Sequence, residues 1–288
     1  MTKVGFIGTG VMGKAMATHI LKAGYPLFVY NRTKEKALEL IKAGATWCNT
    51  PAEVAQHAEV ILTIVGYPSD VREVYYGEAG IFSSVKPDTI LIDLTTSTPT
   101  LAKEIYQTAK ENSCFALDAP VSGGDLGAKR GTLSTMAGGD KEVFQKALPI
   151  FETFSKTIKL QGTTGSGQHT KMANQIMIAG TMTGLVEMLA YADKSGLNLS
   201  DVLETVGGGS AGNWSLENYG PRILKGDYSP GFFVKHFLKD LSIALDEAEK
   251  MNLDLPCTKL ARKLYQDLCD EGYQNDGTQA LMRLYSTI

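Results

Sequence analysis

A short apolar run near the N-terminus, Val4–Ile7, leads directly into a glycine-rich turn with the sequence GTGVMG. An amphipathic helical pattern follows to about Ala23, and Gly24 stands just after it. In a GxGxxG turn the first glycine permits the tight bend, the second lets the backbone approach a pyrophosphate, and the third lets the helix pack on the strand. The helix N-terminus then favours the anion. This order predicts a dinucleotide site, whereas a merely structural glycine turn is the weaker alternative. The turn residues predicted to bind the cofactor are Gly8, Thr9, Gly10, Val11, Met12 and Gly13.

The second predicted strand, Leu27–Tyr30, ends at Asn31, Arg32 and Thr33, with no acidic residue among them. An NAD-binding protein usually places a carboxylate there, which accepts hydrogen bonds from the ribose hydroxyls. Arg32 can instead pair with a 2′-phosphate, while Asn31 and Thr33 can add neutral hydrogen bonds. The sequence therefore predicts NADP as the cofactor, with NAD less favoured. The alternative is that Arg32 is a solvated surface residue and Thr33 only the N-cap of a helix through Ala43.

Strand and helix patterns continue to alternate up to about residue 162. A capping box with proline at N1 begins at Thr50, strands are predicted at 60–65, 116–119, 133–137 and 156–160, and a helix at 141–151. The carboxyl ends of parallel strands meet at one edge of a sheet, where open α/β folds bind ligands. Val65, Tyr67 and Thr96 follow two such strands, so we expect them to contact the cofactor. For Thr96, an ordinary helix cap before Pro99 is an equal alternative.

A glycine-rich loop, Pro120–Gly124, follows the strand at 116–119. Gly123 and Gly124 offer backbone N–H groups unobstructed by side chains, and Ser122 places a hydroxyl beside them. Such a loop suits a carboxylate group. A flexible turn is the alternative, because glycine is permissive in any loop.

The longest helical pattern covers Gly165–Lys194 and is not interrupted by proline. Small residues recur on one of its faces, and Lys171 and Asn174 lie together on a neighbouring face. Strand and helix alternate before it, and helical patterns dominate after it. We therefore place a domain boundary near Gly162 and expect this helix to join two domains, because clefts between domains commonly bind small molecules.

Composition excludes several classes of protein. A chain of 288 residues fits about two domains, and a net charge of -3, from 28 basic and 31 acidic residues, offers no basic field for nucleic acid or an anionic membrane. The four cysteines form no CxxC pair, and His169 and His236 lack partners at metal-ligand spacing, so no metal is predicted. No targeting segment or membrane span is visible, and a cytoplasmic location is expected.

Four ordered motifs resemble the β-hydroxyacid dehydrogenase family of the 6-phosphogluconate dehydrogenase superfamily, which includes 3-hydroxyisobutyrate dehydrogenase, tartronate semialdehyde reductase and glyoxylate/succinic semialdehyde reductases. They are GFIGTGVMG at 5–13, DAPVSGG at 118–124, GSGQHTKMANQ at 165–175 and FLKDL at 237–241. The resemblance implies an NADP-binding Rossmann domain at residues 1–162. It also implies an all-α domain for substrate binding and dimerisation at 163–288, organised on the long interdomain helix.

The same resemblance implies site residues. It makes Lys171 the catalytic acid/base, lets Asn174 orient the substrate, assigns the substrate carboxylate to Ser122–Gly124, and sets Lys239 beside the cofactor. The implied activity is hydride transfer between NADP(H) and a small carboxylated aldehyde or 3- or 4-hydroxy acid, in a homodimer or homotetramer. The alternatives are a solvent-facing Lys171, a surface ion pair at Lys239–Asp240, and a catalytically silent NADP-binding module. The helical region's aromatic residues are expected mainly in its core: Trp214, Tyr219, Phe232 and Phe233.

Overall fold

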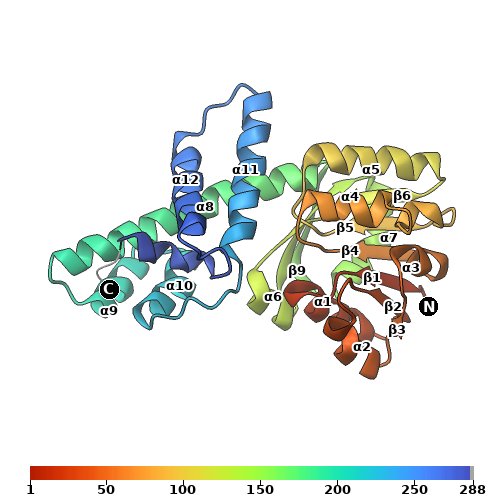
Figure 1. The fold of residues 1–288 in the computed structure, drawn as a ribbon, viewed down its shortest axis with the longest axis horizontal. Helices are drawn as coiled ribbons and strands as arrows, with labels where there is room; N and C mark the ends of the chain where they lie inside the picture. Colours follow the sequence, from red (N-terminus) through yellow and green to blue (C-terminus); the bar gives the residue numbers. More distant parts are fainter. Residues whose placement is uncertain (286–288) are drawn as a thin grey trace. The chain divides into compact units, whose positions relative to one another are not determined.

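The computed structural model describes residues 1–285, and the chain divides into two compact units (Figure 1). The first unit, Met1–Lys171, is α/β, and the second, from Met172 onward, is all-helical. A Rossmann-type domain followed by a helical region is therefore confirmed.

The strands of the first unit are β1 (Val4–Ile7), β2 (Leu27–Tyr30), β3 (Thr46–Trp47), β4 (Val60–Thr63), β5 (Ile90–Asp93), β6 (Phe115–Asp118), β7 (Val121–Ser122), β8 (Leu133–Gly139) and β9 (Ser155–Gly162). They form one sheet in the order β3-β2-β1-β4-β5-β6-β8-β7, with β9 paired to β8. The six strands from β3 to β6 in this order are parallel, whereas β8 is antiparallel to both β6 and β7. The carboxyl ends of the parallel strands therefore share one edge, as expected.

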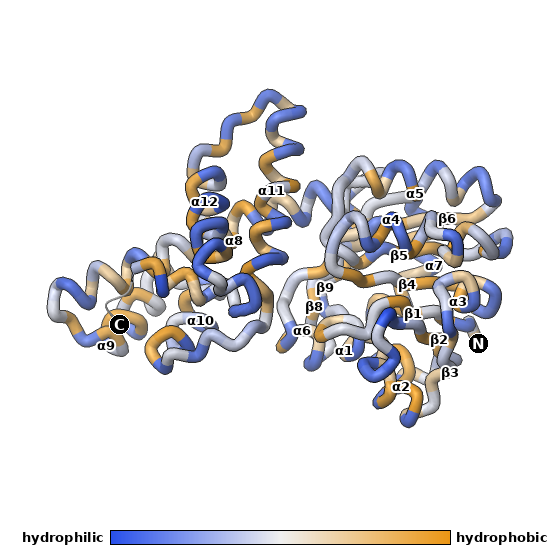
Figure 2. The backbone as a smooth tube through the Cα atoms, in the orientation of Figure 1, coloured by the Kyte–Doolittle hydropathy of each residue, from blue (hydrophilic) through white to orange (hydrophobic). Residues whose placement is uncertain are grey.

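The helices of this unit are α1 (Val11–Lys22), η1 (Lys34–Ala37), α2 (Leu38–Lys42), α3 (Pro51–His57), α4 (Pro68–Tyr76), η2 (Ile81–Ser83), α5 (Pro99–Glu111), α6 (Gly124–Arg130) and α7 (Lys141–Phe151). Alternate strand residues supply two separate cores, because helices cover both faces of the sheet. Phe6 and Leu62 pack with α1, α2, α6 and α7, whereas Ile7 and Ile61 pack with α3, α4 and α5. The central strands are accordingly apolar along their length (Figure 2).

Helix starts follow the sequence closely, with three local differences. The Thr50 side chain accepts from Glu53 N at 3.0 Å, but the Glu53 carboxylate accepts from Asn49 N rather than from Thr50 N. Thr98 caps α5 by accepting from Leu101 N, so Thr96 is not the cap of this helix. Thr33 makes no side-chain cap, and a 3₁₀ turn precedes α2.

The second unit is built on the part of α8 (Ser166–Lys194) that follows Lys171. Its other helices are α9 (Leu199–Gly207), α10 (Trp214–Leu224), α11 (Val234–Lys250), α12 (Pro256–Asp270) and η3 (Thr278–Tyr285). Its core contains Leu185, Phe237 and Tyr265, and it includes the expected Tyr219. Phe232 packs against this core, but Trp214 is 50% exposed, so its expected burial is wrong. No helix within residues 1–285 is long and apolar enough to cross a membrane.

Candidate active site

The three glycines of the GTGVMG turn differ in what requires them. A Cβ at Gly8, whose φ is +98°, would overlap the Ile64 carbonyl oxygen, and one at Gly13 would overlap the Gly8 carbonyl oxygen. A Cβ at Gly10 would meet no atom within 4 Å. Gly8 and Gly13 are thus demanded by the fold, whereas Gly10 keeps open the space beside the α1 N-terminus. Gly10 makes no side-chain cap and Thr9 Oγ1 is buried without a hydrogen-bond partner in the described chain, so this turn fits a pyrophosphate.

The end of β2 supports the turn and carries the predicted cationic side chain. Asn31 Oδ1 accepts from Thr9 N at 2.9 Å, and Asn31 Nδ2 donates to Thr33 O, so Asn31 holds the turn against the strand. The Arg32 side chain is 88% exposed and lies 3.7 Å from Asp70 Oδ1. The strand-end pattern did not reveal this carboxylate, because Asp70 belongs to α4.

A buried polar network connects the strand ends to the start of α8. Val65 N donates to Thr95 Oγ1 at 3.0 Å, and Thr95 N donates to Asp93 Oδ1 at 3.0 Å. Burial raises the pKa of Asp93, and its hydrogen bonds from Thr95 and Thr63 oppose this rise. The resulting pKa is about 6. Gln168 then bridges the loop after β5, donating to Thr95 O and accepting from Ser97 N. Sequence reasoning assigned no role to Asp93, Thr95 or Gln168.

The last residue of β6, Asp118, anchors the first turn of α8. Its carboxylate accepts from Gly165 N at 2.7 Å and from Gln168 N at 2.8 Å. Burial raises the pKa of Asp118, and these backbone hydrogen bonds oppose that rise. A Cβ at Gly167 would overlap the Met136 carbonyl oxygen, so the helix start also sits close against β8. Asp118 and Gly165 each begin one of the motifs quoted above. Those motifs were the sequence signal that could have indicated this contact.

Lys171 is buried, with 6% of its surface exposed, and its Nζ donates to Val121 O at 2.9 Å. The solvent-facing alternative is therefore wrong. Val121 directly precedes Ser122, and Gly123 and Gly124 have φ values of +127° and +63° that side chains rarely adopt. The structure thus brings the predicted acid/base to the predicted carboxylate loop.

The remaining site residues lie in the second unit. Asn174 Nδ2 donates to Gln175 Oε1 at 2.7 Å, and Gln175 Nε2 donates to Asp240 Oδ2 at 2.6 Å. Lys239 Nζ lies 2.9 Å from Asp240 Oδ1, and the two side chains are only 12% and 1% exposed. This is a buried ion pair, so the surface-pair alternative is wrong.

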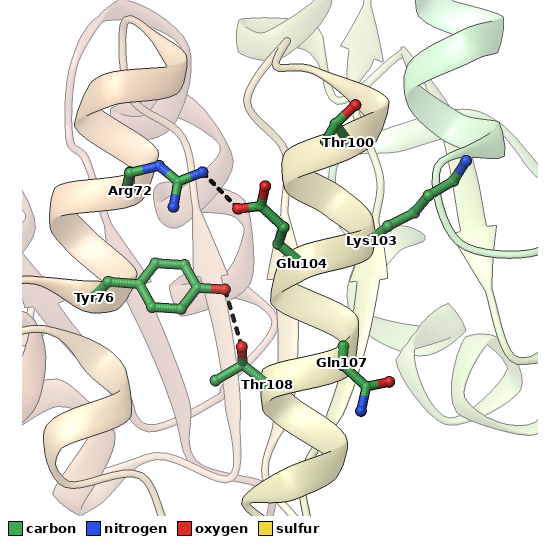
Figure 3. Close-up of a pocket in the computed structure, with 7 residues that line it drawn as sticks. All are labelled: Arg72, Tyr76, Thr100, Lys103, Glu104, Gln107 and Thr108. Carbon is green, nitrogen blue, oxygen red and sulfur yellow. Dashed lines mark hydrogen bonds and ion pairs between the residues drawn. The ribbon is translucent and has the colours of Figure 1, made fainter.

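The molecule also has two surface grooves whose lining does not include these site residues. One, of about 510 Å³, lies between α4 and α5, where Arg72 pairs with Glu104 and Tyr76 Oη contacts Thr108 (Figure 3). None of the predicted site residues lines it. The other, of about 760 Å³, follows an exposed face of α8 past Met177, Gly180 and Gly184, and no charged residue lines it. Within residues 1–285 no three His, Cys, Asp or Glu side chains gather as metal ligands would.

Comparison with known families covers nearly the whole chain. Residues 3–165 match the NAD binding domain of 6-phosphogluconate dehydrogenase. Residues 165–285 match the domain described as NAD-binding of NADP-dependent 3-hydroxyisobutyrate dehydrogenase. The chain belongs to the β-hydroxyacid dehydrogenase family.

Individual relatives agree with this membership. Probable 3-hydroxyisobutyrate dehydrogenase-like 1 of Arabidopsis thaliana is 50% identical, over 98% of this chain and 84% of its own. The NAD-dependent L-serine dehydrogenase of Pseudomonas aeruginosa is 35% identical, over 99% and 98%. A solved structure of Mycobacterium tuberculosis 3-hydroxyisobutyrate dehydrogenase with L-serine is 26% identical, with a TM-score of 0.89 and 99% coverage of both chains. The protein is therefore an oxidoreductase of the NAD(P)-dependent hydroxyacid dehydrogenase type.

Proposed function

We propose that this enzyme transfers a hydride between NADP(H) and a small carboxylated aldehyde or 3- or 4-hydroxy acid, with Lys171 as the acid/base. The observation that carries the proposal is the 2.9 Å hydrogen bond from Lys171 Nζ to Val121 O. It holds an ammonium group beside Ser122, Gly123 and Gly124. A substrate carboxylate bound by that loop places a nearby carbonyl oxygen within reach of a proton donor.

The bound cofactor supplies or accepts the hydride, and the chain's own residues hold it. We propose that the glycine turn takes the pyrophosphate and that Arg32, with Asn31 and Thr33, meets the 2′-phosphate. We further propose that contacts come from Val65, Tyr67, Thr96 and Lys239. The exposed Arg32 guanidinium supports NADP. A relative named as NAD-dependent makes NAD the alternative.

The proton transfer falls to Lys171. Reduction of an aldehyde needs a proton on oxygen as hydride reaches carbon, and the reverse oxidation needs a base for the hydroxyl proton. Asn174 follows Lys171 by one helical turn of α8, and we propose that its amide orients the substrate. The competing proposal, a catalytically silent module, is disfavoured because Lys171 is both present and buried.

We also propose a domain of residues 163–288 for substrate binding and dimerisation, in a homodimer or homotetramer. The uncharged groove along α8 and the 67% exposure of Met177 support association through this helix. The cytoplasmic location stays a prediction.

A panel assay tests the activity. NADPH consumption is measured with glyoxylate, succinic semialdehyde, methylmalonate semialdehyde and tartronate semialdehyde, and NADP⁺ reduction with 3-hydroxyisobutyrate and L-serine. The matched control for a substitution of Lys171 is Lys194→Ala. Lys194 is an exposed lysine at the end of the same helix, α8, and its substitution should keep full activity. Binding of NADPH with no turnover of any substrate would favour the silent module.

A further inference from the structure

Gln168, in the first turn of α8, joins this helix to the loop that follows β5. Its side chain is buried, with 0% of the residue exposed. Its Nε2 donates to Thr95 O at 2.7 Å, and its Oε1 accepts from Ser97 N at 2.9 Å. These two backbone groups lie on either side of Thr96, so one amide group holds the loop on both sides of that residue.

The direction of the Gln168 amide follows from these two partners. The Thr95 carbonyl oxygen can only accept a hydrogen bond, and the Ser97 N–H can only donate one. A reversed amide would oppose two acceptors at Thr95 and two donors at Ser97, in a site without exposure to water. The Ser97 hydroxyl offers no other anchor, because it is buried without a hydrogen-bond partner within residues 1–285.

The helix turn and the loop that Gln168 joins are each held by a buried carboxylate. On the helix side, Asp118 accepts from Gln168 N at 2.8 Å and from Gly165 N at 2.7 Å. On the loop side, Asp93 Oδ1 accepts from Thr95 N at 3.0 Å. Because both backbones are held, the length and direction of one glutamine side chain set the separation between them.

Both of these backbone segments belong to the proposed active site. Lys171, the proposed acid/base, follows Gln168 by three residues, which is about one turn of the same helix. Thr96, between the two groups that Gln168 binds, is among the residues proposed to contact the cofactor. Hydride and proton transfer require the cofactor and the acid/base to be in place together, so a change in this separation should slow the reaction.

We propose that Gln168 is a positioning residue for the reaction, which sets the loop at 95–97 at the correct distance from the helix turn that carries Lys171. The side chain acts through its two backbone partners and not on the reacting atoms. This inference rests on the proposed function, in which the loop contacts the cofactor and Lys171 transfers the proton.

Two substitutions separate the hydrogen bonds of Gln168 from its volume. Gln168→Met keeps a side chain of similar length without an amide, so Thr95 O and Ser97 N lose this buried partner. Gln168→Glu keeps the shape, but its hydrogen bonding changes with pH. A carboxylate has only acceptors and would oppose Thr95 O, whereas a carboxylic acid has a donor and an acceptor, as the amide has. The matched control is Gln145→Glu, because Gln145 is an exposed glutamine on α7.

The readouts are kcat at saturating cofactor and substrate, the Kd for NADPH, and the folded fraction at each pH. At about pH 8 we expect both Gln168 variants to lower kcat by roughly 10- to 100-fold, because a displacement of about 1 Å can have an effect of this size. NADPH should bind roughly 3- to 10-fold more weakly, as expected for the loss of about one hydrogen bond.

The pH dependence of Gln168→Glu is the decisive measurement. Burial and the nearby Asp118 carboxylate should raise the pKa of the introduced carboxyl group. The kcat of Gln168→Glu divided by that of the wild type should therefore rise as pH falls from about 8 to about 6. Asp93, Asp118 and Lys171 are present in both proteins, so this ratio removes their common contribution. The ratio for Gln168→Met should stay constant, and Gln145→Glu should match the wild type throughout.

Three results would overturn the inference: a kcat of Gln168→Met within about threefold of the wild type, a Gln168→Glu ratio that does not rise as pH falls, or losses of kcat no larger than the unfolded fraction. If Gln168→Met does not fold, the pH series of Gln168→Glu decides alone. If the wild type turns over no substrate, the proposed function fails, and NADPH affinity tests whether Gln168 holds the loop. The Kd of Gln168→Glu should then approach the wild-type value as pH falls, and a wild-type Kd already at about pH 8 would refute this role.

Discussion

The cofactor preference should depend on Arg32, and the structure sets its size. A charge-assisted hydrogen bond contributes about 1.5–3 kcal/mol. The Arg32 side chain is 88% exposed, which favours the lower end of that range. Asp70 Oδ1, 3.7 Å from the guanidinium, competes with a phosphate by about 1 kcal/mol at most. The net preference of about 0.5–2 kcal/mol corresponds to roughly 2- to 30-fold in kcat/KM for NADPH over NADH.

Arg32→Ala should therefore lower kcat/KM for NADPH by this factor and leave that for NADH nearly unchanged. Asp70→Asn should raise the preference by up to about fivefold, because it removes the competing charge and keeps an acceptor for Tyr67 N. The assay is initial-rate kinetics with both cofactors at low and high salt, since an exposed pair weakens as salt rises. Arg72→Ala, on the same helix as Asp70, is the control. Equal use of both cofactors by the wild type, or equal losses in Arg32→Ala, would refute the reasoning.

Four further predictions concern other parts of the molecule. Lys171→Ala should reduce turnover by roughly 100-fold or more while NADPH still binds, and near-normal turnover would remove the acid/base role. Ser122→Ala should raise KM for carboxylated aldehydes more than for uncharged ones of similar size; equal increases would exclude a carboxylate site there. Burial raises the pKa of Asp93 from 3.8 to about 6, so the folded state holds this proton more tightly and the group's contribution to stability falls as pH rises from about 4 to about 6. Asp93→Asn should remove this fall, by up to about 3 kcal/mol in urea unfolding, and parallel pH profiles would contradict it. A Cβ at Gly180 would meet no atom within 4 Å in its own chain, so Gly180→Glu should leave the fold intact but lower the oligomeric state seen in sedimentation; an unchanged mass would exclude a role for this face in assembly.

Local patterns in the sequence were sufficient for most of the fold. The strand at 4–7 and the helix at 141–151 have the predicted bounds, because apolar periodicity and capping residues act over a few neighbouring positions. Two short strands, β3 and β7, were not predicted. Each has only two residues, too few to show a period, and each forms because a longer strand pairs with it.

The candidate site was predictable at single residues but not in its connections. The glycine turn, Lys171 and the loop after β6 carry recognisable chemistry, whereas Asp118 contacts Gly165 across 47 positions and Gln175 contacts Asp240 across 65. The pattern of a single sequence does not show which residues far apart in the chain contact each other. A partial signal existed for Asp240, because it lies on the same face of α11 as Phe237, Leu241 and Ala244, where a carboxylate needs a partner.

The conformation of Gly10, the middle glycine of the GTGVMG turn, also allows a useful control protein to be made. Gly10 has φ -69° and ψ -162°, a conformation open to any residue, and a methyl group there touches nothing in the protein. Gly10→Ala should therefore fold and melt like the wild type while obstructing the pyrophosphate. This variant serves as a blank for binding measurements. Any change in heat, fluorescence or mass that it still shows with NADPH comes from binding at a place other than this turn. That signal can be subtracted from every NADPH titration of the wild-type enzyme.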